Sequence, residues 1–380
     1  MKNFQGTPVN IDNYIIGKII KKPEITQILK SRNYILATSQ KIPTWFPMKA
    51  YILEKFNSTL HKRKKPFVYN IAKEDIDLLQ NGDVVLLKKD GSVILLYEIS
   101  SPHNALFVTN KCNLRCLTCP QPPDATQALS FEENLKLIEM MDPKKTHTLA
   151  LTGGEPTILN ENFIKLIKVC HKFLPKTLII VLTNGTRFVD FNFTKKVAEV
   201  SNNIFIAVSL YSDNDIIHDK LTGVEGSFYQ TVKGLHNLAL FKQKVEIRVV
   251  LTKMNIERLP NIAEFIYHNF PFVTHVALMG LEITGNAKKN VDLLWIDPFE
   301  YQKELLLTCK YLNRYNLHFS IYNHPLCVVP ESLRKFCRQS ISSWKKTYLD
   351  ICEKCSVKSN CGGLFLTSAP YYSKFLNPII

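Results

Sequence analysis

The feature that most constrains this fold is an alternation of short apolar runs and amphipathic stretches that begins near residue 104. Ser130 and Glu133 have the spacing of a capping box and predict a helix start. Further helices are expected over 163–173, 228–241 and 262–267. Strands alternating with helices predict a parallel sheet with right-handed crossovers. The predicted strands are Leu106–Thr109, Thr148–Thr152, Leu178–Thr183, Ile204–Leu210, Val245–Thr252 and Val276–Leu281.

Six strand–helix units fit a partial (βα)6 TIM-like barrel, because a full eight-unit barrel needs about 250 residues. An open doubly wound sheet fits the same periodicity, and the sequence does not separate the two. Near the N-terminus, Val84–Leu87 and Val93–Tyr97 flank Asp90-Gly91, a pair that predicts a tight hairpin. We therefore expect an α/β protein with a mainly β accessory domain (1–100), a partial barrel (101–320) and a cysteine-rich region (321–380).

Composition narrows the class of protein. No apolar run is long enough to cross a bilayer, and the N-terminus lacks the apolar core of a signal peptide, so a cytoplasmic protein is expected. In a reducing compartment, ten cysteines indicate metal binding or chemistry rather than disulfides. The net charge of +15 would suit phosphates or acidic peptides, but the lysines are spread along the chain without interleaved aromatics. Nucleic-acid binding is therefore not the favoured interpretation.

Four motifs follow predicted strands directly. A C-x3-C-x2-C loop follows the first strand, Gly153-Gly154-Glu155-Pro156 the second and Asn184-Gly185-Thr186 the third, and Ser209-Leu210 closes the fourth. The carboxyl ends of parallel strands form one rim, where such barrels bind ligands. The loop cysteines are Cys112, Cys116 and Cys119. Three thiolates can hold three irons of a cubane cluster and leave one iron open, whereas a zinc site would need a fourth ligand.

The other rim residues also suggest ligand binding. Gly153 and Gly154 would let the backbone approach a ligand closely, and Glu155 would accept a hydrogen bond from an ammonium group. Asn184 and Ser209 would contact ribose hydroxyls or a carboxylate. Taken singly, each of these motifs also fits a turn or a helix cap. His218 is expected at a surface helix start, with a place in the substrate cavity as the alternative.

Together, these motifs resemble the radical S-adenosylmethionine (SAM) enzymes. The resemblance implies a [4Fe–4S] cluster on the three loop cysteines and cleavage of SAM to methionine and a 5′-deoxyadenosyl radical, which abstracts hydrogen from a substrate. Two positions depart from the family pattern: Thr118 stands where an aromatic residue is usual, and Tyr211-Ser212 stands where Asp-Gly is frequent. Arg248 is a further candidate for the SAM carboxylate, with a plain surface arginine as the alternative. The residues implied to bind SAM are Gly153, Gly154, Glu155, Asn184, Ser209 and Arg248.

Within that superfamily, residues 106–110, 120–123, 275–282 and 361–379 resemble the His-Xaa-Ser system maturases of the HxsC type. This resemblance implies a ribosomally made precursor peptide with His-Xaa-Ser repeats as substrate. It also implies a partner maturase of the HxsB type and an electron donor such as ferredoxin or flavodoxin. An RNA- or cofactor-modifying radical enzyme and a non-enzymatic zinc protein are the alternatives.

A second cysteine group, Cys352, Cys355 and Cys361, lies near the C-terminus. It resembles one half of an auxiliary-cluster domain, the kind of domain that is appended to peptide-modifying radical enzymes. A fourth thiolate would complete a second [4Fe–4S] site, or a four-cysteine zinc site. Cys327 is the expected fourth ligand because it follows the strand-like segment 319–322, and Cys337 is the rival.

Overall fold

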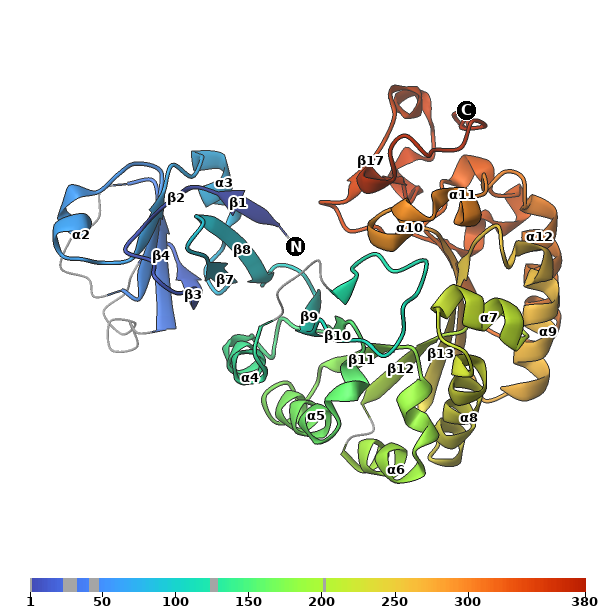
Figure 1. Cartoon of the computed structure of the whole chain (residues 1–380). Coiled ribbons are helices and arrows are strands. Elements are labelled where there is room, and N and C mark those ends of the chain that lie inside the picture. Colours follow the sequence, from blue (N-terminus) through green and yellow to red (C-terminus); the bar gives the residue numbers. More distant parts are fainter. Residues whose placement is uncertain (1, 23–32, 41–47, 124–128, 201–202) are drawn as a thin grey trace. The chain divides into compact units, whose positions relative to one another are not determined.

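The computed structural model describes residues 2–22, 33–40, 48–123, 129–200 and 203–380 (Figure 1). Contacts divide the chain into two compact units. The first unit comprises residues 1–106, 131–150 and 169–178. The second comprises residues 107–130, 151–168 and 179–380.

An eight-stranded sheet forms most of the first unit, in the order β1-β8-β7-β3-β4-β5-β6-β2. The predicted hairpin is confirmed, because β7 and β8 pair antiparallel and Gly91 in their turn has a φ of +85°. Two short helices, α2 and α3, accompany the sheet, as expected for a mainly β domain. The elements are β1 (Asn3–Gln5), β2 (Thr7–Val9), β3 (Ile15–Ile20), β4 (Tyr34–Thr38), β5 (Ala50–Leu53), α2 (Ser58–Lys62), β6 (Phe67–Tyr69), α3 (Lys73–Leu78), β7 (Val84–Leu87) and β8 (Ser92–Tyr97).

The first and last strands of this sheet are neighbours in the sequence. β1 pairs with β8, β2 pairs with β6, and only Gly6 separates β1 from β2, so residues 3–9 join the two ends of the sheet. A Cβ on Gly6 would lie 2.5 Å from the carbonyl oxygen of Tyr69, which explains the glycine. One apolar cluster takes side chains from seven of the strands, including Ile19, Ile52 and Val85, and fills the interior.

The second sheet has the order β16-β15-β14-β13-β12-β11-β10-β9. The six predicted strands are confirmed as β9–β14, and β15 and β16 extend the sheet. Each strand lies beside the next along the chain, and the pairing is parallel from β11 to β16. A doubly wound sheet reverses its order at a switch point, so this order is that of the predicted partial barrel. The strands are β9 (His103–Thr109), β10 (Thr148–Gly153), β11 (Leu178–Thr183), β12 (Ile204–Ser209), β13 (Lys244–Leu251), β14 (His275–Gly280), β15 (Phe319–Tyr322) and β16 (Cys337–Arg338).

Helices α6, α8, α9 and α12 form the outer layer of the sheet (Figure 1). Burial alternates along β13, where Val245, Ile247, Val249 and Leu251 are buried while the residues between them face the barrel interior. Helices α4, α5, α8 and α9 confirm the predictions, whereas α6, α7 and α12 were not predicted. No helix in the described ranges is long and apolar enough to cross a membrane. The helices are α4 (Phe131–Met140), α5 (Glu161–Phe173), α6 (Phe191–Val200), α7 (Asp215–Thr222), α8 (Ser227–Leu240), α9 (Leu259–Asn269), α10 (Gly285–Lys289), α11 (Val291–Leu294) and α12 (Gln302–Arg314).

The cysteine-rich end of the chain contains little regular structure. A two-stranded antiparallel pair, β17 (Lys346–Thr347) with β18 (Leu364–Phe365), brackets the last three cysteines. Short 3₁₀ turns over 350–354 and 358–360 place Cys352, Cys355 and Cys361 within one compact loop.

Candidate functional site

A cavity of about 300 Å³ lies at the carboxyl ends of strands β9–β14. Its wall includes all nine rim residues that the sequence singled out. Tyr211, His218 and Asn286 also line it. The structure thus brings together side chains that lie between Cys112 and Asn286 in the sequence. The nine residues are Cys112, Cys116, Cys119, Gly153, Gly154, Glu155, Asn184, Ser209 and Arg248.

The loop that carries Cys112, Cys116 and Cys119 (the cysteine loop) forms backbone hydrogen bonds with the C-terminal end of α7. The backbone N–H of Arg115 donates to the carbonyl oxygen of Thr222 at 2.9 Å, and that of Leu117 donates to Leu221 at 2.9 Å. Gly223, with φ +68°, follows directly, and a Cβ there would lie 2.8 Å from the Arg115 carbonyl oxygen. The close approach of the two segments therefore depends on glycine at this position.

The same loop is also held by the segment after β14. Asn286 donates from its backbone N–H to the Cys119 carbonyl oxygen at 2.8 Å and from Nδ2 to the Cys116 carbonyl oxygen at 3.1 Å. A Cβ on Gly285 would lie 2.6 Å from the Cys119 carbonyl oxygen. Asn286 therefore fixes the backbone that carries two of the three thiols. No local pattern in the sequence indicates this role, because Asn286 lies 170 residues beyond Cys116.

The three loop thiols are free and partly buried. Burial raises the pKa of Cys112 and Cys119, and it raises the pKa of Cys116 to about 12. Without a compensating positive charge these thiols would stay protonated, and a metal centre supplies such charge. The three thiols line one cavity, which fits a multi-iron cluster held by three cysteines.

Gly153 is the last residue of β10 and Gly154 follows it. Both glycines lie against the segment where β9 ends and the cysteine loop begins. A Cβ on Gly153 would be 2.2 Å from the Thr109 carbonyl oxygen, and one on Gly154 would be 2.1 Å from the Lys111 carbonyl oxygen. Gly154 N–H donates to the Thr109 carbonyl oxygen at 2.7 Å. The glycines therefore permit close packing against the start of the cysteine loop as well as lining the cavity.

The Glu155 carboxylate is buried, with only 1% of the residue exposed, and it accepts several hydrogen bonds. Its Oε1 accepts from Thr157 N at 3.1 Å, Thr157 Oγ1 at 2.6 Å and Thr183 Oγ1 at 2.7 Å. Its Oε2 accepts from Asn184 N at 2.7 Å. Two of these four hydrogen bonds, from Thr183 and Asn184, join the motif after β10 to the end of β11, a structural role that the sequence did not predict.

Asn184 is linked to the cysteine loop by its side chain. Its Nδ2 donates to Asn113 Oδ1 at 2.9 Å, and Asn113 Nδ2 donates to Thr186 Oγ1 at 2.8 Å. Thr186 Oγ1 in turn donates to Asn184 Oδ1 at 2.7 Å. This closed ring of three side chains connects the loop after β9 with the loop after β11.

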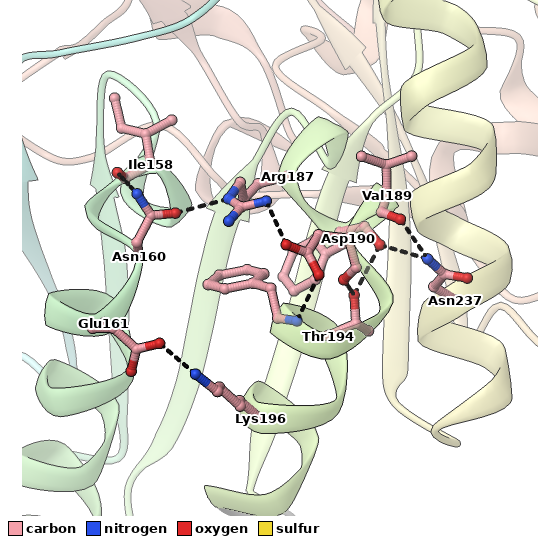
Figure 2. A network of polar contacts seen from close by, with 11 residues as sticks. Ile158, Asn160, Glu161, Arg187, Val189, Asp190, Thr194, Lys196 and Asn237 are labelled. Atoms are coloured by element: carbon pink, nitrogen blue, oxygen red, sulfur yellow. Dashed lines mark hydrogen bonds and ion pairs between the residues drawn. The ribbon is translucent and has the colours of Figure 1, made fainter.

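A polar network fixes the loop after β11 on its outer side (Figure 2). Arg187 donates from Nε to Asn160 Oδ1 at 2.8 Å and from Nη1 to Asp190 Oδ2 at 3.0 Å. Asn237 of α8 donates from Nδ2 to the Val189 carbonyl oxygen at 3.0 Å. The loop that carries Asn184 is thereby anchored to the segment before α5 and to α8.

Arg248 lies beside Ser209, since the two residues are partners in the register of β12 and β13. Its Nε is buried and has no hydrogen-bond partner among the described residues, with Glu246 Oε1 at 3.5 Å. Glu246 Oε2 is 2.8 Å from His275 Nδ1, and His275 Nε2 is 3.0 Å from Ser320 Oγ. The alternative interpretation, a plain surface arginine, is therefore wrong, because Arg248 lines the cavity and lies beside Glu246.

His218 is buried, with 1% of the residue exposed, which corrects the expectation of a surface helix start. Its Nδ1 accepts a hydrogen bond from the backbone N–H of Tyr211 at 3.3 Å. Burial lowers the pKa of His218 to about 4, so the ring is neutral near pH 7. The Tyr211 hydroxyl lies 2.9 Å from Thr118 Oγ1, so the two departures from the family pattern contact each other.

The C-terminal cysteines form a second, smaller site. Cys327, Cys352, Cys355 and Cys361 all line a cavity of about 30 Å³, and Cys337 does not line it. Two backbone N–H groups, of Leu326 at 3.4 Å and of Gly363 at 3.5 Å, point at Cys361 Sγ. This grouping favours Cys327 over Cys337 as the fourth ligand.

Comparison with known proteins finds a family profile that matches the part of the chain carrying most of the first site. The Radical SAM superfamily profile matches residues 106–266. The chain is 29% identical over 214 residues to the antilisterial bacteriocin subtilosin biosynthesis protein AlbA of Bacillus subtilis, covering 52% of this chain and 47% of that protein. It is 30% identical over 188 residues to Fe-coproporphyrin III synthase of Methanosarcina barkeri, covering 49% and 45%. The chain thus spans about half the length of these relatives.

Among solved structures, Streptococcus suis SuiB bound to S-adenosylmethionine matches with a TM-score of 0.50 at 17% sequence identity. The match covers 69% of this chain and 57% of SuiB. At this identity the likeness concerns the fold alone.

Proposed function

We propose that this protein is an enzyme that reductively cleaves SAM, because residues 106–266 match the Radical SAM superfamily profile. The observation that carries the proposal is one cavity lined by the three loop cysteines and by the residues expected to bind SAM. A [4Fe–4S] cluster held by Cys112, Cys116 and Cys119 would keep one iron open and supply the electron that splits SAM into methionine and a 5′-deoxyadenosyl radical, which abstracts hydrogen from the substrate.

The residues around the cysteines would bind and orient SAM. Arg248 has a buried Nε that makes no hydrogen bond among the described residues and has only the Glu246 carboxylate nearby at 3.5 Å, which leaves it free to donate to the SAM carboxylate. Glu155 Oε2 accepts one hydrogen bond in the structure and keeps capacity for the ammonium group. Asn184 and Ser209 end neighbouring strands and offer polar groups to the carboxylate or the ribose. Gly153 and Gly154 leave space in the wall beside them.

The substrate we propose is a ribosomally made peptide. The similarity to the subtilosin biosynthesis protein AlbA supports this class, as does the second group of cysteines. The sequence resemblance to HxsC-type maturases further suggests His-Xaa-Ser repeats in the peptide, an HxsB-type partner and ferredoxin or flavodoxin as reductant. A cofactor precursor is the second candidate, because Fe-coproporphyrin III synthase is as similar to this chain as AlbA is.

For the C-terminal site we propose a second [4Fe–4S] cluster on Cys327, Cys352, Cys355 and Cys361. These four residues share one cavity, and backbone N–H groups point at Cys361 Sγ, as is common around iron–sulfur ligands. Zinc on the same four thiolates is the alternative. Metal and sulfide analysis distinguishes the two possibilities. Two clusters predict about eight irons per chain, whereas zinc in the C-terminal site would leave about four irons per chain.

The decisive experiment is anaerobic incubation of the reconstituted protein with SAM, dithionite and candidate peptides. We expect 5′-deoxyadenosine by chromatography and a mass change in a His-Xaa-Ser peptide. An RNA substrate would instead show binding that weakens steeply with salt, with a log–log slope of about −4 if about six phosphates of a single strand are neutralised.

Cys116→Ala should abolish 5′-deoxyadenosine formation, because it removes one of three cluster ligands. Cys170→Ala is the matched control: Cys170 is also buried but lines neither cysteine cavity, so its variant should retain iron and activity. Undiminished formation by Cys116→Ala would refute the ligand assignment. Cys352→Ala should lower the iron content by about half while some uncoupled SAM cleavage persists.

A further inference from the structure

An apolar cluster joins the cysteine loop to three segments that follow it in the sequence. Leu117 of the loop packs in this cluster with Leu221 of α7, Met254 after β13 and Ala287 of α10. Backbone hydrogen bonds connect the loop to α7 and α10 as well, as described above, and all of these segments belong to the second unit. The exposed side chains beside the cluster therefore surround the loop that carries the three thiols.

These segments carry a group of exposed cations. Each cation lies within two residues of a member of the apolar cluster, and none forms an ion pair with another described residue. Two aliphatic side chains are exposed beside them, Ile216 of α7 by 78% and Leu293 of α11 by 53%. We call these seven residues the α7–α10 surface. Its cations are Arg115, Lys220, Lys253, Lys288 and Lys289.

The acidic residues of α7 and α11 do not balance this charge. Asp219 accepts hydrogen bonds from the start of α8, and Asp215 accepts one from the Tyr229 hydroxyl. Asp292 of α11 is exposed. The α7–α10 surface therefore has an excess of positive charge, which attracts an acidic partner.

The four lysines of this surface lie outside the large cavity. Thr222 and Asn286 line the cavity, whereas Lys220 and Lys288, each two residues away, do not, and neither do Lys253 and Lys289. A substrate must place an atom inside the cavity to react, but a protein that only supplies an electron can stay outside its wall. The exposed Ile216 and Leu293 are aliphatic, so they offer no ring on which nucleic-acid bases could stack. The position and chemistry of the surface therefore fit a protein that delivers electrons.

We propose that the α7–α10 surface is the docking site of an acidic one-electron carrier protein that reduces the iron–sulfur cluster. The proposal rests on the proposed function, since it requires a cluster on the cysteine loop. In the step concerned, the reduced carrier loses one electron and the oxidised cluster gains it, with no bond formed or broken. A small interface of charges around a few apolar side chains is typical of such short-lived redox complexes.

The test compares two reductants for 5′-deoxyadenosine formation by the iron-loaded protein under anaerobic conditions. One is dithionite, and the other is flavodoxin, an acidic carrier, kept reduced by NADPH and its reductase. In Lys288→Gln/Lys289→Gln we expect the apparent KM for flavodoxin to rise about three- to tenfold at low ionic strength, because two exposed charge pairs are lost. The dithionite-supported rate should stay unchanged, because this small reductant does not need the surface. Added salt should raise the KM of the unmodified protein more steeply than that of the variant.

A matched control is available on α12. Lys303 and Lys310 are also exposed lysines of the second unit, but they lie outside the segments of the α7–α10 surface. Lys303→Gln/Lys310→Gln removes the same charge from the protein, so its KM for flavodoxin should equal that of the unmodified protein.

If Lys288→Gln/Lys289→Gln shows the flavodoxin KM of this control, the proposal is wrong while the dithionite activity keeps the proposed function. Should that variant lose the dithionite activity too, Lys220→Gln/Lys253→Gln replaces it, and an unchanged flavodoxin KM there overturns the proposal. Turnover with dithionite but none with flavodoxin would also overturn it. So would a variant that weakens binding of an RNA oligomer or a His-Xaa-Ser peptide and leaves the flavodoxin KM unchanged. Absence of 5′-deoxyadenosine with both reductants would overturn the proposed function itself.

Discussion

Replacing Asp219 by alanine should destabilise the protein by about 1–3 kcal/mol. Helix α8 begins after Gly226, which has no side chain to cap it, and the Asp219 carboxylate performs that task from α7. It accepts from Gly226 N at 2.6 Å, Ser227 Oγ at 2.7 Å and Phe228 N at 2.8 Å. Loss of a capping side chain costs about 0.5–2 kcal/mol, and loss of a negative charge at a helix N-terminus adds about 0.3–1 kcal/mol.

The assay is urea unfolding under anaerobic conditions, followed by tryptophan fluorescence. Trp295 and Trp344 both lie in the second unit, together with α7 and α8, so their emission reports on the affected part. Asp219→Asn should have intermediate stability, because one side-chain oxygen remains to accept hydrogen bonds from the start of α8. Its expected loss is about 1 kcal/mol. Asp215→Asn is the control: this residue is one turn earlier in α7, is only partly buried, and keeps a side-chain oxygen for the Tyr229 hydroxyl, so its replacement should change stability by less than about 0.5 kcal/mol.

The reasoning would be refuted if Asp219→Ala matched the unmodified protein within about 0.5 kcal/mol. It would also be refuted if Asp219→Asn were as destabilising as the alanine variant, since charge and acceptor would then not contribute separately. The effect should reach the cavity, because Thr231 of α8 donates to the carbonyl oxygen of Asn184 at 3.0 Å. We therefore expect weaker SAM binding by Asp219→Ala, measured by calorimetry at a temperature where the variant is folded.

Two further predictions concern the same unit. Gly154→Ala would place a Cβ 2.1 Å from the Lys111 carbonyl oxygen, so the cysteine loop must shift; we expect a loss of about 1–3 kcal/mol and a lower iron content after reconstitution. Burial lowers the pKa of His218 from 6.5 to about 4, so the unfolded chain binds the proton more readily and stability falls as the pH drops from about 6.5 to about 4, by up to about 3 kcal/mol. His218→Asn keeps an acceptor for the Tyr211 N–H and should lack this part of the pH dependence; equal pH profiles in urea unfolding would contradict the assignment.

The partial barrel could be predicted from sequence because its signals are local. Each of the strands β9–β14 is a compact apolar run, and each functional motif follows one strand directly, so strand order alone places Cys112, Gly153, Asn184 and Ser209 on one rim. Parallel strands require this arrangement whatever the details of packing. The structure places these residues around a single cavity.

The contacts that complete the site could not be predicted, because they join distant parts of the chain. Asn286 bonds to the Cys116 carbonyl from 170 residues away, and Thr118 meets Tyr211 across 93 residues. Neither pair leaves a pattern in a short window of sequence. The burial of His218 was missed for a related reason: its sequence neighbours Asp215 and Lys220 are polar, while the rings of Tyr211 and Phe228 that pack against it lie elsewhere in the sequence.

The joined ends of the N-terminal sheet limit what that domain can bind. Its terminal strands β1 and β2 have three residues each, and the six strands between them are paired on both sides. An incoming peptide strand therefore has almost no open backbone ladder to extend, and sheet-to-sheet aggregation is disfavoured for the same reason. Any ligand of this domain would have to be recognised by side chains and loops on its surface.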